Sequence, residues 1–490
     1  MATTNTAIDP KCVASTNNTF CKSVRESDKL WRNAPRNHGR DHGSESNFFR
    51  EAQFSPDGTS IVTQSEDHSL RTFILPTDLL DEEHQPHHLN EYAVGPASGN
   101  IQAFATHPGF DLRDSSTTVV LSAVSDQPIS LRNALDYSFT YAVYYSISPT
   151  TEVYLPSTSL AFTGDGRRFI AGSSNLISVF DCSRSGEGPI TRHATAESRK
   201  SRQLYGAASM SCRGRISALS ISSSGILAAG STEREVALYG NGGQGECITA
   251  FSIAQHPDGS SPSGTGVTGL GWSPCDQYVL IAERQSECIQ VYDVRNALSR
   301  VACLTGRKAD STQKLGFDIV PTSEGCEVWA GGTDGVVKMW RNPGRWGHEQ
   351  APEGEMKLHE DSIASAVWHP TSAILATCSG QRFERTGVWD DDSSPSSDSS
   401  GSSDDETTSS ASEFCAKNQN LVPSPCANPG KFGGGKFVNT RGTCKPKQWV
   451  PSYWCREQVF ETCAQSPADE NNQKRFGRNG LADVCYAGCG

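Results

Sequence analysis

The 490-residue sequence lacks several features that mark well-known classes of protein. No apolar run approaches the roughly 20 residues of a membrane-spanning helix, and Met1–Lys11 lacks the apolar core of a secretory signal. We therefore expect no membrane association. Methionine is scarce, with 4 residues, whereas glycine contributes 45, and serine and threonine are abundant. This composition favours many short strands joined by tight turns over long helices.

Catalytic motifs are also missing. Neither G-x-S-x-G nor H-E-x-x-H occurs. Gly264–Gly269 matches G-x-G-x-x-G, but it precedes a predicted strand instead of following one and opening a helix, so we interpret it as a glycine-rich loop. His84, His87 and His88 lie beside acidic residues, where an exposed loop is favoured over a metal cluster. We expect no enzyme activity, cofactor, metal or small-molecule substrate.

A repeated unit occupies residues 48–390. Each copy has an apolar strand, a turn such as Ser55-Pro56-Asp57-Gly58, a second apolar strand and a third strand that ends in an aromatic residue. In this turn Pro sets φ, Asp bonds to its own backbone and Gly accepts a positive φ. The seven copies, spaced by about 50 residues, lie at 54–75, 104–135, 160–181, 216–239, 267–295, 315–341 and 363–390.

The repeat endings identify the fold class. Phe180-Asp181, Tyr292-Asp293 and Trp389-Asp390 are the Trp-Asp dipeptide of WD40 repeats or aromatic variants of it. Each such repeat forms one four-stranded blade, and the blades close radially. The sequence therefore predicts an all-β fold, a seven-bladed WD40-type β-propeller over 48–390. A β-sandwich is the alternative, but its strands would not repeat in triplets with the same turn chemistry.

The segments outside the repeat are polar. Residues 1–47 form a polar N-terminal segment, in which 12–24 have strand character and are the candidate for a ring-closing strand. Residues 25–47 resemble an insertion. Residues 391–412 are rich in Ser and Asp and almost free of apolar side chains, which predicts a disordered acidic linker.

The 17 cysteines fall into two groups. Ten are scattered over 12–378, several inside apolar runs, and we expect these to be inert core residues. The other seven crowd into a Cys-rich segment, 413–490, for which a disulfide module, a metal module and a poorly ordered or non-native tail stay open. The odd count argues against complete disulfide pairing. The absence of histidine and of C-x2-C argues against zinc.

Basic residues gather between two of the repeats, although the net charge of the chain is −12. The run starts at Arg184 and contains few acids. One interpretation is an ordinary solvated loop, and the other is a patch that neutralises RNA phosphates, with Tyr205 available for stacking. The candidate RNA-binding residues are Arg192, Arg199, Lys200, Arg202, Arg213 and Arg215.

The last copy carries the most specific motif. Ser379-Gly380-Gln381-Arg382, after Trp368-His369-Pro370, resembles the last-blade motif of the telomerase Cajal-body WD-repeat protein family, whose fungal members are splicing-associated WD-repeat proteins. Asp126–Leu131 and Trp329–Gly335 agree in order and spacing, and the resemblance extends over roughly 48–385. The insertion and the Cys-rich segment match nothing in the family. Gly380 is expected at a tight backbone position, whereas Arg382 has both a structural interpretation, a pair across blades, and a functional one.

This resemblance implies a non-catalytic nuclear adaptor, with possible presence in the cytoplasm. The adaptor would bind small nuclear ribonucleoprotein RNAs and proteins, in pre-mRNA splicing or in small-RNP assembly and localisation, as a monomer. A general WD40 protein–protein scaffold without RNA binding, such as a G-β-like signalling adaptor, is the alternative. Salt dependence distinguishes the two, because phosphate binding weakens steeply with salt.

Overall fold

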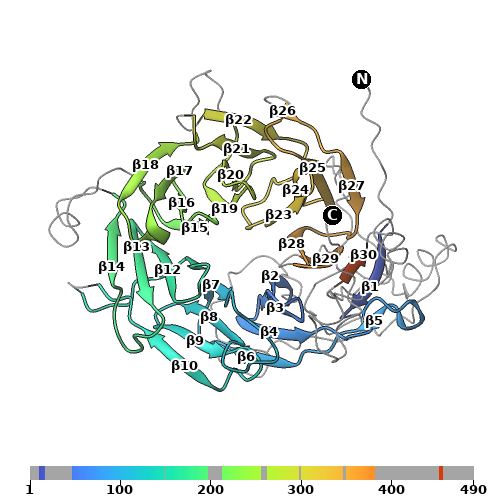
Figure 1. Cartoon of the computed structure of the whole chain (residues 1–490), viewed down its shortest axis with the longest axis horizontal. Coiled ribbons are helices and arrows are strands. Elements are labelled where there is room, and N and C mark those ends of the chain that lie inside the picture. Colours follow the sequence, from blue (N-terminus) through green and yellow to red (C-terminus); the bar gives the residue numbers. More distant parts are fainter. Residues whose placement is uncertain are drawn as a thin grey trace, which may run out of the picture.

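The computed structural model of the chain is an all-β ring of sheets (Figure 1). It describes residues 10–16, 47–148, 151–196, 212–254, 262–296, 299–345 and 349–380, and the backbone of 452–455. Within these ranges the only helical elements are two short 3₁₀ turns, η3 (Glu82–His84) and η4 (Asn241–Gly243). None of the helices described is long and apolar enough to cross a membrane. The radial arrangement is the predicted β-propeller.

Six sheets are blades built from four antiparallel strands. From blade 1 to blade 6, the innermost strands are β2 (Phe49–Phe54), β7 (Ile101–Thr106), β11 (Ser159–Phe162), β15 (Ile216–Ile221), β19 (Val267–Trp272) and β23 (Phe317–Thr322). The second strands are β3 (Ser60–Ser65), β8 (Val119–Val124), β12 (Arg168–Ser173), β16 (Leu227–Ser231), β20 (Tyr278–Glu283) and β24 (Gly325–Gly331).

The outer half of each blade follows the same order. The third strands are β4 (Ser69–Ile74), β9 (Ile129–Asn133), β13 (Leu176–Asp181), β17 (Glu235–Tyr239), β21 (Ile289–Asp293) and β25 (Val336–Arg341). The outermost strands are β6 (Ala93–Pro96), β10 (Thr140–Tyr144), β14 (Thr191–Ala194), β18 (Cys247–Ser252), β22 (Ser299–Leu304) and β27 (Gly354–Lys357). Blade 5 gains a short parallel strand outside β22, which is β26 (Glu349–Gln350).

A composite sheet lies between blade 6 and blade 1 (Figure 1). In order from the axis it contains β28 (Ile363–Trp368), β29 (Ile374–Ser379), β30 (Ser452–Cys455), β1 (Lys11–Ser15) and β5 (His87–His88). The predicted third strand of the last repeat, 388–390, lies outside the described residues, and β30 of the Cys-rich segment pairs with β29 in its place. The described residues thus show six blades, and the seven-bladed ring stays a prediction.

The terminal segments lie largely outside the described residues. This holds for 17–46 in the N-terminal segment, for the predicted acidic linker at 391–412, and for all of the Cys-rich segment except β30. In the N-terminal segment, β1 runs antiparallel to β30 and parallel to β5. The strand character predicted for 12–24 therefore coincides with β1 only in part.

The ring has two faces, defined by strand direction. We call the end at which the innermost strands begin the top face, and the end at which they turn into the second strands the bottom face. Because neighbouring strands are antiparallel, the second strands end at the top face. The Ser-Pro-Asp-Gly turn of blade 1 lies on the bottom face, where Asp57 accepts a hydrogen bond from the Thr59 amide at 3.1 Å and Gly58 has φ +72°.

A histidine from the preceding sheet covers this turn. The Nε2 atom of His369 lies 2.8 Å from the Gly58 carbonyl oxygen, and a Cβ on Gly58 would lie 2.4 Å from the His369 ring. The same contact joins His107 of blade 2 to Gly166 of blade 3. The composite sheet therefore packs against blade 1 in the same way as blade 2 packs against blade 3.

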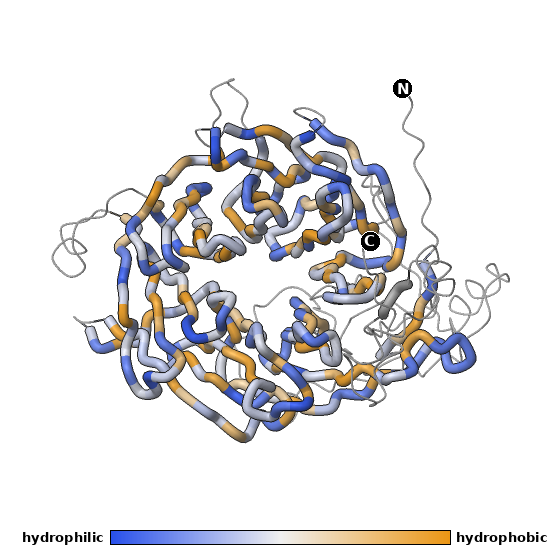
Figure 2. The backbone as a smooth tube through the Cα atoms, viewed as in Figure 1, coloured by the Kyte–Doolittle hydropathy of each residue, from blue (hydrophilic) through white to orange (hydrophobic). Residues whose placement is uncertain are grey.

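Apolar side chains fill the space between neighbouring sheets instead of one central core. All six residues of β3 and of β8 are buried, because sheets pack on both of their faces. The described residues form seven buried clusters, each shared by two neighbouring sheets. One cluster joins the composite sheet to blade 1 through Val13, Phe73 and Ile374. Figure 2 shows apolar segments distributed around the whole ring.

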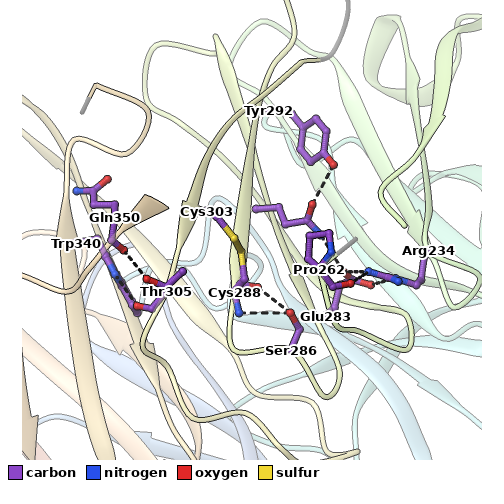
Figure 3. Close-up of a disulfide and its surroundings, with 11 residues drawn as sticks. Arg234, Pro262, Glu283, Ser286, Cys288, Tyr292, Cys303, Thr305, Trp340 and Gln350 are labelled. Atoms are coloured by element: carbon purple, nitrogen blue, oxygen red, sulfur yellow. Dashed lines mark hydrogen bonds and ion pairs between the residues drawn. A yellow bond between two sulfur atoms is a disulfide. The ribbon is translucent and has the colours of Figure 1, made fainter. Parts of the chain in front are cut away.

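The cysteines correct one prediction. Cys288 and Cys303 form a disulfide between the strands at the outer side of blade 5, with their Cα atoms 5.7 Å apart (Figure 3). Cys275 is free and exposed. The prediction that the scattered cysteines are inert core residues is therefore wrong for these three. It holds for Cys212 and Cys326, which are free and buried, and burial raises their thiol pKa values to about 12 and about 11.

A buried histidine makes stability sensitive to acid. The His359 side chain is 2% exposed, and its Nε2 atom lies 2.8 Å from the Thr377 hydroxyl. Burial lowers its pKa well below the ordinary value of 6.5. Because the unfolded chain takes up a proton that the folded protein excludes, the free energy of unfolding should fall as pH drops below about 6.5. The loss should be about 1.4 kcal/mol per pH unit until the depressed pKa is reached.

Urea unfolding at pH 7.5, 6.5 and 5.5 tests this expectation against the variant His359→Gln. An amide keeps a polar partner for Thr377 but does not titrate, so the loss between pH 6.5 and 5.5 should be about 1 kcal/mol smaller than in the parent. It should not vanish, because burial also lowers the pKa values of His107, His193 and His369. Equal losses in both proteins would contradict the assignment.

Candidate nucleic-acid interface

The predicted basic loop leaves and rejoins the described chain at the top face. Thr195 follows the last residue of β14, and three residues separate Cys212 from the start of β15. The Cys212 amide donates a hydrogen bond to the Thr195 carbonyl oxygen at 2.6 Å, and the Thr195 amide donates to the Asn175 carbonyl oxygen at 3.0 Å. These bonds fix both ends of the loop between blades 3 and 4.

The structure separates the described candidates into two places. Arg192 is partly exposed on β14, the outermost strand of blade 3, opposite Ser178. Arg213 and Arg215 are exposed where the loop returns to the innermost strand of blade 4. The other three candidates, Arg199, Lys200 and Arg202, lie outside the described residues. The structure therefore brings together only Arg213 and Arg215.

Hydrogen bonds hold the backbone of these two arginines. The Arg213 amide donates to Glu235 Oε2 at 2.5 Å, and the Arg215 amide donates to Thr232 Oγ1 at 3.2 Å. Between them, Gly214 donates to Asn175 Oδ1 at 2.8 Å and has φ +97°, a conformation that favours glycine. The backbone is thus satisfied locally, and both side chains stay exposed.

A third arginine reaches the top face from blade 1. Arg50 is the second residue of β2, where Phe49 pairs with Ser65 and Glu51 pairs with Gln64, so that Arg50 stands on a β-bulge. Bulges at barrel rims redirect a side chain. The innermost strands β7, β15, β19 and β28 have a bulge at the same second position. The sequence carries no signal for this feature, and sequence reasoning missed Arg50.

A fourth arginine, Arg284, follows the last residue of β20. Its amide donates to the Gly266 carbonyl oxygen at 3.0 Å, and its side chain is partly buried. Burial lowers the pKa of the Arg284 guanidinium, and the positive charges of Arg215 and Arg50 lower it further. The three arginines belong to blades 1, 4 and 5, whose strands β2, β15 and β20 lie around the axis of the ring in Figure 1.

The acids of this face neutralise only part of that charge. Arg50 Nε lies 3.5 Å from Glu66 Oε2, and Lys314 Nζ lies 2.8 Å from Glu51 Oε2. Within the described part of the chain, no carboxylate lies within 4.0 Å of the guanidinium of Arg215 or Arg284, and neither group donates a hydrogen bond. Arg215 and Arg284 thus carry positive charge on the top face that no described residue pairs.

Comparison with known proteins places the chain among WD-repeat proteins. No family profile matches it. It is 30% identical over 303 residues to guanine nucleotide-binding protein negative regulator 1 of Schizosaccharomyces pombe, covering 60% of this chain and 71% of that protein. The chain belongs to the WD-repeat family of that protein. This membership supports a scaffold or adaptor role.

The family also contains the predicted relatives. The chain is 25% identical over 348 residues to human telomerase Cajal body protein 1, covering 69% of this chain, and it spans 57% of that protein's length. It is 28% identical over 146 residues to protein SWT21 of Kluyveromyces lactis, covering 29% of this chain and 34% of that protein. The predicted resemblance to the telomerase Cajal-body WD-repeat family is confirmed.

The family motif reaches the top face at the end of β29. Ser379 Oγ donates to the Asp361 carbonyl oxygen at 3.0 Å, and the Gly380 amide donates to the Ser362 carbonyl oxygen at 2.8 Å. Gly380 is buried and has φ +156°. Its expected tight backbone position stays a prediction. Gln381 and Arg382 lie outside the described residues, so both interpretations of Arg382 stay predictions.

The glycine-rich motif has a packing role. It leads into β19, which contains its last three residues, and opens no helix. A Cβ on Gly264 would lie 2.6 Å from the Glu283 carboxyl group, and a Cβ on Gly266 would lie 2.7 Å from the Thr232 carbonyl oxygen. Arg234 Nε pairs with Glu283 Oε1 at 2.7 Å (Figure 3). The glycines therefore let this loop pack over an ion pair between blades 4 and 5.

The histidine cluster does not form a simple loop. The segment is exposed at His84 and His88, as predicted, but it is not all loop, because His84 ends η3 and His87 and His88 form β5 beside β1. In the described ranges, no group of His, Cys, Asp and Glu is arranged to hold a metal ion.

Proposed function

We propose that this chain is a non-catalytic nuclear adaptor whose propeller binds small nuclear ribonucleoprotein RNAs and proteins through its top face. The observation that carries this proposal is the unpaired positive charge of Arg215 and Arg284 beside the anchored basic loop. Such a surface binds phosphates without a reactive pocket. The name of the telomerase Cajal body relatives supports a nuclear ribonucleoprotein setting. The role would be in pre-mRNA splicing or in small-RNP assembly and localisation.

We also infer that the composite sheet is a seventh blade, so that the propeller of 48–390 closes with a strand from the N-terminal segment. Three observations support this. The His369–Gly58 contact repeats the contact between blades 2 and 3. A buried cluster joins β1 and β29 to blade 1. The innermost strand β28 has the bulge that four of the blades carry in theirs. A closed ring would present its loops to partners as a monomer.

The test begins with recovery of the full-length protein from nuclear extract, followed by sequencing of bound RNA with and without nuclease treatment. Fluorescence anisotropy then measures the affinity of the purified protein for the enriched RNA between 50 and 200 mM salt. Four phosphate contacts to single-stranded RNA would weaken binding about 50-fold over that range, given a slope of about 0.7 per contact.

Charge reversal of Arg199, Lys200 and Arg202 to Glu tests the basic loop in the same assay. We expect at least a roughly tenfold loss of RNA affinity, because three attractive charges become repulsive near the phosphates. Unchanged affinity would remove the loop from the interface.

A general protein–protein scaffold is the second candidate function. It is favoured by the name of the Schizosaccharomyces pombe relative, guanine nucleotide-binding protein negative regulator 1. In that case RNA recovery would not exceed that of an unrelated control protein, and the recovered protein complex would survive high salt, because apolar docking depends little on ionic strength.

A further inference from the structure

We propose that Arg50, Arg215 and Arg284 form one phosphate-binding site at the axis of the top face, which takes the sugar–phosphate backbone of single-stranded RNA. The inference rests on the proposed function and adds to it a defined contact site. The sequence pointed to Arg215 but not to Arg50 or Arg284, because the three residues come from blades 1, 4 and 5.

The fold places the three residues at equivalent ends of strands. Arg50 stands on the bulge at the start of β2, Arg215 directly precedes β15, and Arg284 directly follows β20. Innermost strands begin and second strands end at the top face, so all three side chains start from the same face. Figure 1 shows β2, β15 and β20 around the centre of the ring. In agreement with this placement, the positive charges of Arg215 and Arg50 add to burial in lowering the pKa of Arg284.

Structural arginines in this protein look different. Arg71 is buried and pairs with Asp67 at 2.7 Å, and Arg234 pairs with Glu283 at 2.7 Å. Buried Arg307 donates to the Gly331 carbonyl oxygen at 2.9 Å. In contrast, the guanidinium groups of Arg215 and Arg284 have no acceptor among the described residues. Arg50 has Glu66 at 3.5 Å, whereas the charges of Arg215 and Arg284 stay uncompensated by the described residues, and a bound anion would neutralise them.

The chemistry of the site fits a phosphodiester. A guanidinium group donates two parallel hydrogen bonds to a phosphate, and three such groups from separate blades can each contact a different phosphate. Arg213 extends the same positive surface from Arg215 toward the basic loop. Positive groups spread over three blades, with exposed Arg213 two residues from Arg215, suit an extended single strand better than one small anion, so RNA is favoured over a free polyphosphate.

The experiment compares two triple variants of the full-length protein. One is Arg50→Ser, Arg215→Ser and Arg284→Ser. The matched control is Arg113→Ser, Arg167→Ser and Arg345→Ser, which removes three exposed arginines from the bottom face and changes the net charge equally. Both are titrated with a fluorescent 12-nucleotide oligouridine at several salt concentrations. The top-face variant should bind at least about tenfold more weakly at 0.1 M salt, with a salt slope smaller by about 2, and the control should bind like the parent.

The outcomes separate the site from the adaptor function. If the parent binds RNA and the top-face variant binds equally well, the site is overturned and the adaptor proposal survives. If the parent does not bind the oligouridine or the RNA from nuclear extract, the RNA backbone is overturned as the ligand. Calorimetry with inositol hexakisphosphate then tests the same arginines: loss of binding in the top-face variant supports a phosphate site for a small polyanion, and unchanged binding overturns the site altogether.

Folding of the variants is checked by urea unfolding. The top-face variant should unfold at the same or a higher urea concentration than the parent, because it loses mutual repulsion. If it unfolds earlier, the single variant Arg215→Glu replaces it, since Arg215 is exposed and only its backbone is hydrogen-bonded to neighbours. RNA affinity that is unchanged in Arg215→Glu would also overturn the site.

Discussion

Replacement of Asp67 by Ala should lower the free energy of unfolding by about 3–5 kcal/mol, because it leaves a buried arginine without its bidentate partner. The Arg71 side chain is 1% exposed, and its Nη1 and Nη2 atoms donate to the two Asp67 oxygens at 2.9 and 2.7 Å. Its Nε atom donates to Glu91 Oε2 at 2.9 Å. Glu91 is partly exposed and reaches only one side of the guanidinium, so it cannot replace Asp67. Urea unfolding followed by tryptophan fluorescence measures the loss.

Two controls make this prediction specific. The double variant Asp67→Leu with Arg71→Met should be much more stable than Asp67→Ala, because no uncompensated charge stays buried. The variant Glu355→Ala removes a partner of Lys338 at 2.8 Å, where Glu355 is 41% exposed, and should cost no more than about 1 kcal/mol. If Asp67→Ala were no more damaging than Glu355→Ala, the buried ion pair would not stabilise blade 1.

Replacement of Gly335 by Ala should destabilise the protein by about 2–5 kcal/mol. Gly335 has φ +73°, and a Cβ there would lie 1.9 Å from the His359 carbonyl oxygen. That oxygen belongs to backbone that cannot easily move, because the amides of Leu358 and His359 both donate to the Gly335 carbonyl oxygen at 3.1 Å. The substitution therefore combines backbone strain with a clash between blade 6 and the chain that enters the composite sheet.

The matched control is Gly186→Ala. Gly186 has a similar φ, +80°, but a Cβ there would meet nothing within 4 Å. It should show only the left-handed backbone cost of about 1–2 kcal/mol. Similar urea midpoints for the two variants would contradict the clash at Gly335.

Much of the fold could be predicted from local signals. The Ser55-Pro56-Asp57-Gly58 turn and its relatives depend on the conformations of four adjacent residues, so the repeats could be counted without coordinates. Six of them became blades at the predicted places. The outer strands that pair with the last repeat were harder to predict, because they come from distant segments: β1 begins at Lys11 and β30 at Ser452. Such pairing follows from sheet edges that meet in space and not from neighbouring residues.

Some residues of the candidate site could also be predicted from the sequence, and others could not. The basic run between the repeats at 160–181 and 216–239 was visible in the sequence, because its residues are adjacent. Arg50 and Arg284 were not visible in this way, since each lies at the end of a strand, without a neighbouring basic run, about 235 residues from the other. The disulfide of Cys288 and Cys303 was missed for a related reason: their closeness depends on the register of β21 and β22.

The amino-acid order alone determined the repeat, the turns, the blade type and the family, because each rests on short-range chemistry between neighbours along the chain. Only the tertiary structure decided which charges share a face and which are neutralised. A ring of sheets brings one end of every innermost strand to a common axis, and residues from blades 1, 4 and 5 meet there regardless of their distance in sequence.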